Sequence, residues 1–309
     1  MSTTLGQLAA LATSLSWSVT SILFTLSGRR VGSTVVNRTR LLFAVLFAGL
    51  VHWATEGQIF PFGAEPYRLG WLAVSGLIGF VFGDSCLFQA LVMIGPRLSM
   101  LLMALAPVLS TVMGWAFLHE TLSRQELLGI AVTIGGVALV VSDRPNGSNS
   151  DAGAIGPRSG RQYFVGILFG LGAAVGQAGG FFASRMGLGG DFPALSGSVI
   201  RLTTAAVAIW LLTLLWGKAR TTVEALRAQP RALLLIVGGA ATGPFLGVWL
   251  SLIAIQNAPL GVASTLTSLA PIILLPVGHF LFKEQIGVRA IGGTAAAIVG
   301  IAMLFLSTT

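Results

Sequence analysis

The stretch ALAPVLSTVMGWAFLHE, residues 104–120, carries a proline inside an apolar run and ends on a glutamate. The same pattern returns as SLAPIILLPVGHFLFKE, residues 268–284, in which Pro271 corresponds to Pro107 and the last residue is again a glutamate. Both copies are apolar over about the length that a helix needs to cross a bilayer. A segment of this kind that occurs twice indicates a membrane protein built from an internal duplication.

The composition of the chain excludes most soluble classes of protein. It has 309 residues, of which 54% are hydrophobic and 9% are charged, and its mean hydropathy is +0.87. So few ionisable side chains cannot cover a soluble globule of this size. The formal net charge is +8, but the basic residues are scattered singly or in pairs between apolar runs, as in loops at a membrane surface. We therefore expect a lipid bilayer, and no nucleic acid, as a partner.

Apolar runs broken by charges, Pro or Gly predict ten membrane-spanning helices. These are expected near residues 5–27, 34–53, 69–93, 97–118 and 125–142, and near 163–185, 195–216, 231–256, 260–282 and 288–307. Residues 144–162 are rich in Gly, Ser, Asn and Pro, a composition typical of flexible connectors. This pattern predicts a first repeat over 1–143, a linker over 144–162 and a second repeat over 163–309.

The two halves align with each other over most of their length. A shift of 164 residues needs no gap and pairs Pro66 with Pro230, Gly79 with Gly243, Gly83 with Gly247, Ala90 with Ala254, Pro107 with Pro271, Gly114 with Gly278, Glu120 with Glu284, Gly129 with Gly293 and Gly136 with Gly300. Earlier in each half, a shift of 161 residues pairs Arg40 with Arg201. Since each half has an odd number of helices, the second half must enter the membrane from the opposite face. The predicted fold is an all-α integral membrane protein with ten transmembrane helices in two inverted five-helix repeats, in which substrate would bind between the halves.

Each half also carries Ala-Pro, then a Glu, then a Gly at matching spacings: Pro107, Glu120 and Gly129, and Pro271, Glu284 and Gly293. These paired motifs resemble the drug/metabolite transporter superfamily, in particular its EamA-type members with ten helices. The resemblance covers nearly the whole chain. It implies movement of small metabolites across the inner membrane, often as efflux, by alternating access and without ATP hydrolysis.

We accordingly expect a multi-pass protein of the inner (plasma) membrane that exports amino acids or similar polar or amphipathic solutes. A flippase for lipid-linked sugars shares this architecture and is the main alternative. An intramembrane enzyme is a further alternative. However, the single cysteine, Cys86, and the three histidines show no metal-ligand or nucleophile spacing. We expect no catalytic residue, no metal and no cofactor.

The repeated prolines are expected to shape the fourth and ninth helices. Pro107 and Pro271 each remove a backbone hydrogen bond and should kink their helix near mid-membrane. In a bilayer the freed carbonyls need a neighbouring group or a water-lined cavity. The kinks would then line the substrate path, and the alternative is a structural bend without a mechanical role. Glu120 and Glu284 are expected to mark where each helix leaves the hydrocarbon.

Three helix faces are candidates for the lining of a substrate cavity, because their residues recur at helical spacing. They are Ser14, Trp17, Ser18 and Ser21 in the first helix, Met100, Met103, Ala104 and Pro107 in the fourth, and Ser264, Thr267, Ser268 and Pro271 in the ninth. Contacts between neighbouring helices are the alternative explanation.

Charged residues inside the spans carry the most information. Asp84 lies about 22 Å along the third helix, at about 1.5 Å per residue, which is near or somewhat past the midplane. An isolated carboxylate at that depth costs on the order of 3 kcal/mol or more. Asp84 is therefore expected to form a static ion pair, to exchange the protons that would couple transport, or to contact substrate. Its counterpart in the second half is Val248.

Arg40 and Arg201 are the candidate partners of Asp84. They either extend to the membrane surface or point inward, where they would pair with Asp84 or hold an anionic group of the substrate. Gln177 adds neutral hydrogen-bonding capacity to the same candidate site.

The basic residues between the spans are divided unequally between the two faces. One side collects Arg29, Arg30, Arg38, Arg97, Arg144, Arg158, Arg161, Lys218, Arg220, Arg227, Arg231, Lys283 and Arg289, and the other has Arg68, Arg124 and Arg185. The positive-inside rule places the first group in the cytoplasm and both termini outside. The family resemblance implies the reverse, with cytoplasmic termini.

Overall fold

A computed structural model describes residues 3–118, 122–142, 160–189, 192–257, 269–270, 273–274 and 288–306. Regular structure in these ranges is helical, and no strand occurs among them. Eight helical segments of this described part are long and apolar enough to cross a membrane, and a shorter apolar helix covers Ile291–Met303. The predicted ninth span, 260–282, lies almost entirely outside the described residues.

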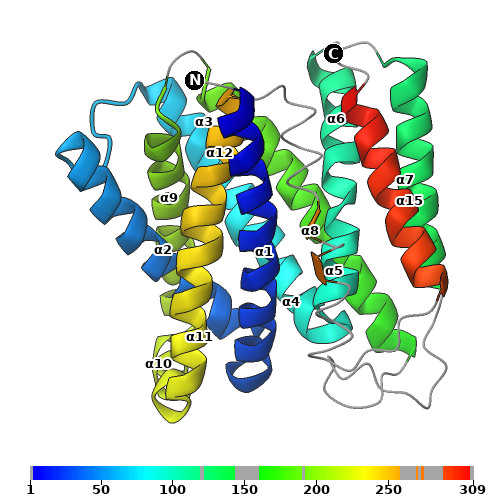
Figure 1. Ribbon diagram of the computed structural model, residues 1–309. Coiled ribbons are helices and arrows are strands. Elements are labelled where there is room, and N and C mark those ends of the chain that lie inside the picture. Colours follow the sequence, from blue (N-terminus) through cyan, green and yellow to red (C-terminus); the bar gives the residue numbers. More distant parts are fainter. Residues whose placement is uncertain are drawn as a thin grey trace.

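The elements of the first half follow the predicted spans closely (Figure 1). They are α1 (Thr3–Val31), α2 (Ser33–Glu56), α3 (Pro66–Gly76), η1 (Leu77–Gly83), α4 (Asp84–Ile94), α5 (Pro96–Met103), α6 (Leu105–Leu118) and α7 (Arg124–Ser142). The elements α3, η1 and α4 follow one another without a break and form one spanning segment. Gly32 and Gly95 make the one-residue turns after α1 and α4 with φ of 86° and 83°, conformations that side chains with a Cβ rarely adopt.

The second half repeats this order. Its described elements are α8 (Gly160–Gly187), α9 (Ala194–Leu215), α10 (Ala219–Ala228), α11 (Pro230–Ala240), η2 (Ala241–Gly247), α12 (Val248–Asn257) and α15 (Val288–Leu306). The short helix α10 was not among the predicted spans, because its ten residues are too few and too polar to cross a membrane. The predicted linker 144–162 falls mostly outside the described residues, between the end of α7 and the start of α8.

Figure 1 shows that the two repeats are inverted. In this view α1 descends from the N-terminus, whereas its counterpart α8 ascends. Likewise α2 ascends and α9 descends, and α7 descends beside the ascending α15. Both termini consequently lie at the same end of the bundle. The predicted all-α fold of two inverted repeats is the fold of the protein.

The packing of α7 against α15 explains why glycines align between the halves. A Cβ added at Gly136 would lie 2.5 Å from the Gly293 carbonyl oxygen, and one added at Gly300 would lie 2.6 Å from the Gly129 carbonyl oxygen. These four glycines are the pairs that the 164-residue shift relates, so each repeat presents the same small face to the other. Such faces let helix backbones approach closely in a membrane, where hydrophobic attraction between helices is absent.

The fourth spanning segment is interrupted near Pro107, as expected. The break falls at Ala104, between α5 and α6, where the Ala104 amide is shared between the carbonyl oxygens of Met100 and Leu101 at 3.2 and 3.1 Å. Pro107 has no amide hydrogen for the Met103 carbonyl, and its ring crowds the preceding turn, which accounts for a break before the proline. Pro271 lies outside the described residues.

Candidate functional site

Two π-helical segments occupy corresponding positions in the two repeats. η1 covers Leu77–Gly83 and η2 covers Ala241–Gly247, so the shift that aligns the sequences also superposes these segments. The Asp84 amide donates to the Gly79 carbonyl five residues back, and the Val248 amide donates to Gly243 in the same way. Short π-helical segments inside α-helices are frequent at functional sites. The repeat in the sequence pairs Gly79 with Gly243 and Gly83 with Gly247, but it did not predict the π turns.

Each π segment is crossed closely by the first helix of the other repeat. η1 packs on α8, where a Cβ added at Gly176 would overlap the Cα of Gly83. η2 packs on α1, where the hydroxyl of Thr20 lies 2.7 Å from that of Thr242. Both π segments therefore lie at the seam between the repeats, where a relative movement of the halves would act on them.

An ion pair between Arg40 of α2 and Asp84 of α4 lies at this seam. The side chains of Arg40 and Asp84 are 1% and 7% exposed, and the guanidinium Nη2 donates to the carboxylate Oδ2. Arg40 Nε donates to Asn37 Oδ1 at 3.0 Å, and Asn37 Nδ2 donates to Ser85 Oγ at 2.9 Å. These bonds fix the guanidinium, so Arg40 points inward and does not extend to the surface.

Aromatic rings surround the guanidinium of Arg40. Its Cζ lies 4.8 Å from the ring centroid of Phe88 and 6.0 Å from those of Phe24 and Phe80. Phe24 and Phe88 meet edge to face with centroids 5.1 Å apart. Cation–π contacts of this kind stabilise a positive charge in a desolvated place.

Arg201 of α9, the repeat-related counterpart of Arg40, is also buried, at 3% exposure. Its Cζ lies 4.8 Å from the Phe80 centroid, so one ring contacts both arginines. Its Nε has no hydrogen-bond partner within the described part of the chain. The charge of Asp84 attracts Arg201, but the carboxylate is already bonded to Arg40. The two arginines thus have different surroundings despite their equivalent positions.

A small cavity lies next to the ion pair. Its lining residues are Trp17, Thr20, Ser21, Phe24, Arg40, Asp84, Leu87, Phe88, Leu91 and Met100. The volume open to the centre of a water-sized sphere is about 10 Å³, which is close to the minimum for one water molecule.

Comparison with known proteins assigns the family. A family model described as "EamA-like transporter family" matches residues 4–142 and again residues 164–306. The chain belongs to the EamA-like transporter family. No curated protein matches it significantly in sequence. Among solved structures, one described as "Crystal structure of protein" is 20% identical, covers 98% of this chain and 99% of its own, and superposes with a TM-score of 0.61. At that identity the likeness shows the fold alone.

The cavity beside the ion pair is too small for a metabolite transported by an EamA-like protein. A solute of several heavy atoms does not fit into a cavity that holds at most one water molecule. The volumes of pockets that bind small ligands are usually some tens of times larger. The described residues therefore leave too little room for a metabolite beside the ion pair, an arrangement that we call closed, and binding there would require neighbouring helices to move.

The predicted site residues fall into four groups in this transporter. Trp17, Arg40 and Asp84 line the cavity. Arg201 contacts the same Phe80 ring, and Met103 packs on the apolar cluster that contains Phe88. Ser264, Thr267, Ser268 and Pro271 lie outside the described residues.

The remaining predicted residues do not line the cavity. Ser14 donates to the Leu11 carbonyl at 2.9 Å, and Ser18 donates to the Ser14 carbonyl at 2.7 Å, so these hydroxyls bond mainly within their own helix. Gln177 and Pro107 are half-buried on α8 and α6. Their binding roles stay predictions.

Several residues that line the cavity were not predicted from the sequence. Thr20 and Phe24 continue the α1 stripe, since residues 17, 20, 21 and 24 recur at helical spacing. Extending that stripe by one turn would have found both. Phe88 had no such signal, because a phenylalanine in an apolar helix does not reveal whether it faces lipid or the seam.

Proposed function

We propose that this EamA-like transporter is a secondary active exporter of small polar or amphipathic metabolites, such as amino acids, in the inner (plasma) membrane. The observation that carries the proposal is a set of buried charges and aromatic rings, centred on Arg40, Asp84, Arg201 and Phe80, at the seam of two inverted repeats. Ionisable groups inside a membrane protein are costly, and where they occur they commonly mark a substrate or ion pathway.

The two π segments supply a means of alternating access. Helices bend where π turns interrupt the regular hydrogen bonding, and η1 and η2 interrupt the third spanning segment of each repeat at the same position. Bending at η1 would open the seam toward one face of the membrane. Because the repeats are inverted, the same bend at η2 would open it toward the other face.

Protons are the proposed coupling ion and Asp84 the proposed coupling residue. In the closed conformation Asp84 is bound to Arg40, so protonation requires the pair to separate as the seam opens. Asp84→Asn should then abolish transport driven by an acid gradient while solute exchange continues, as measured in proteoliposomes with and without a pH gradient. Unchanged dependence on the gradient in this variant would exclude Asp84 as the coupling group.

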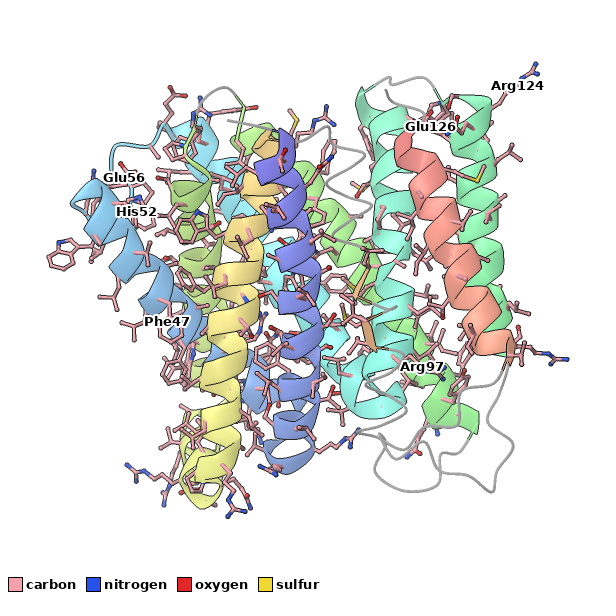
Figure 2. The ribbon with its side chains drawn as sticks, in the orientation of Figure 1. Phe47, His52, Glu56, Arg97, Arg124 and Glu126 are labelled. Atoms are coloured by element: carbon pink, nitrogen blue, oxygen red, sulfur yellow. The ribbon has the colours of Figure 1, made fainter. Side chains whose placement is uncertain are left out.

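The distribution of charge supports an orientation with both termini outside. The last turn of α1 carries Arg29 and Arg30 at the end of the bundle opposite the termini, where α10 also lies. Figure 2 shows Arg124 and Glu126 at the end that bears the termini. The positive-inside rule puts the more basic end in the cytoplasm, whereas family resemblance implies cytoplasmic termini. A reporter that is active only in the cytoplasm, fused after Thr309, should stay inactive, and an active fusion would reverse the orientation.

Transport itself is tested with the purified protein in liposomes loaded with a metabolite mixture. We expect gradient-driven loss of a subset of soluble solutes, absent from empty liposomes and reduced in Arg40→Gln. If no solute moved under any ion gradient, the exporter proposal would fail. If labelled lipid headgroups crossed the bilayer in place of soluble solutes, the protein would be a flippase.

A further inference from the structure

The charges at the seam do not balance. Within the described residues, Asp84 is the only carboxylate in the interior of a spanning helix, since Glu56 ends α2 and Glu126 lies in the first turn of α7. Arg40 and Arg201 both lie in helix interiors and are buried. In the part of the chain that the structure describes, the charge of Arg201 therefore has no carboxylate bonded to it.

The imbalance comes from one difference between the repeats. In the first repeat, Arg40 bonds Asp84, the residue that directly follows η1. In the second repeat, the residue that directly follows η2 is Val248, which offers no charge to Arg201. Both repeats therefore carry the arginine, but only the first repeat carries an acidic residue at the position after the π segment.

The guanidinium of Arg201 is equipped to bind an anion. It has five N–H donors in a planar fork that matches a carboxylate. Its Nε is buried without a hydrogen-bond partner in the described structure, a state that is costly in a low-dielectric interior. An arriving anionic group would satisfy these donors and neutralise the charge.

The surroundings of Arg201 suit a solute with an apolar body. The Phe80 ring lies beneath the guanidinium, and Phe80 belongs to an apolar cluster that also contains Val248, Trp17 and Phe245. Arg201 does not line the small closed cavity. Because Arg201 is only 3% exposed, a solute can reach it only when neighbouring groups move.

We propose that Arg201 binds the carboxylate of the transported solute, so that the solute supplies to the second repeat the negative charge that Asp84 supplies to the first. This rests on the proposed transport function and narrows it to solutes that combine a carboxylate with an apolar body. Amides of the same shape are neutral and amines of the same shape are positively charged, so neither offers Arg201 a negative charge and both should be poor ligands.

The test compares 4-methylpentanoate with its neutral amide, using ligand-induced shifts in the melting temperature of the full-length protein in detergent. The carboxylate should bind the wild type at least about tenfold more tightly than the amide, as expected for charge-assisted hydrogen bonds. Arg201→Gln should remove this preference. Arg220→Gln, which deletes an equal charge from a side chain that is 89% exposed, should keep it.

Val248→Asp provides a second variant that leaves Arg201 in place. The new carboxylate occupies the position of Asp84 in the second repeat, so it should compete with the ligand and lower carboxylate affinity by about tenfold or more. This variant keeps the test decisive if Arg201→Gln does not fold.

Three results would overturn the proposal: no stabilisation of the wild type by the carboxylate, equal binding of the amide, or a preference that survives Arg201→Gln. Transport of cations or neutral solutes that is unaffected by Arg201→Gln would refute carboxylate recognition and leave the transport function standing. Conversely, carboxylate binding at Arg201 without flux of any solute in liposomes would refute transport and leave the binding site standing.

Discussion

The arrangement of two arginines around one carboxylate predicts that removal of Asp84 costs more stability than removal of Arg40. Asp84→Asn leaves both guanidinium groups buried without a negative charge. Arg40→Gln leaves Asp84 buried, but the charge of Arg201 still attracts it. Substitution of the two partners of this ion pair should therefore lower the free energy of unfolding by different amounts.

The size of each effect follows from Coulomb's law and from known buried pairs. Charge centres about 4 Å apart, in an effective dielectric of about 20, attract each other by about 4 kcal/mol, and at twice that separation by about 2 kcal/mol. Loss of one partner from a buried pair typically costs about 3–5 kcal/mol. We expect Asp84→Asn to lower the free energy of unfolding by about 4 kcal/mol, and Arg40→Gln by about 2 kcal/mol.

The assay is unfolding of the purified protein in mixed micelles with increasing denaturing detergent, supported by melting temperatures. The double variant Arg40→Gln with Asp84→Asn should be more stable than Asp84→Asn alone, because only Arg201 then remains uncompensated. Arg220→Gln is the control, since its exposed partner Glu224 leaves little stability to lose. Equal losses for the two single variants, or a larger loss for Arg40→Gln, would refute the shared-carboxylate arrangement.

Two further predictions concern the helix contacts. Gly136→Ala should lower the melting temperature, because overpacking costs about 1–3 kcal/mol of the free energy of unfolding. Gly135→Ala should leave the melting temperature unchanged, since a Cβ added at Gly135 has nothing within 4 Å. Equal effects of the two substitutions would rule out the described α7–α15 contact. Pro107→Ala restores an amide donor to the Met103 carbonyl, so it should strengthen the junction at Ala104 and slow solute flux severalfold in liposomes, and an unchanged rate would show that the break has no part in transport.

The membrane fold could be predicted from two features of the sequence, the length of its apolar runs and its internal repeat. Apolar length identifies a span, and α2, α7 and α9 begin and end within three residues of their predicted limits. The repeat was visible because helix contacts such as those of Gly136 and Gly300 require small residues at fixed positions. Because each repeat has an odd number of spanning helices, the second repeat must have the opposite orientation in the membrane.

The π turns and the short helix α10 were not predictable in the same way. In a π turn each amide bonds the carbonyl five residues back, whereas in an α turn it bonds the carbonyl four residues back. Nothing in residues 77–83 alone favours the longer spacing. The structure places η1 directly against α8, where the backbone of Gly176 comes close to Gly83, and that contact between repeats is not visible in the sequence. α10 lies at the surface, where a short amphipathic helix has no signature of span length.

The sequence by itself determined that this chain crosses a membrane repeatedly, that its halves are related by inversion, and that Asp84, Arg40 and Arg201 are the charges to explain. Hydropathy and repetition suffice for this, because a bilayer imposes its thickness on every spanning helix. Only the tertiary structure decided that both arginines point inward, that Asp84 bonds Arg40, and that Arg201 Nε has no hydrogen-bond partner among the described residues. Which side chains meet depends on how helices from different repeats rotate and approach each other, and that geometry is set by packing at the seam.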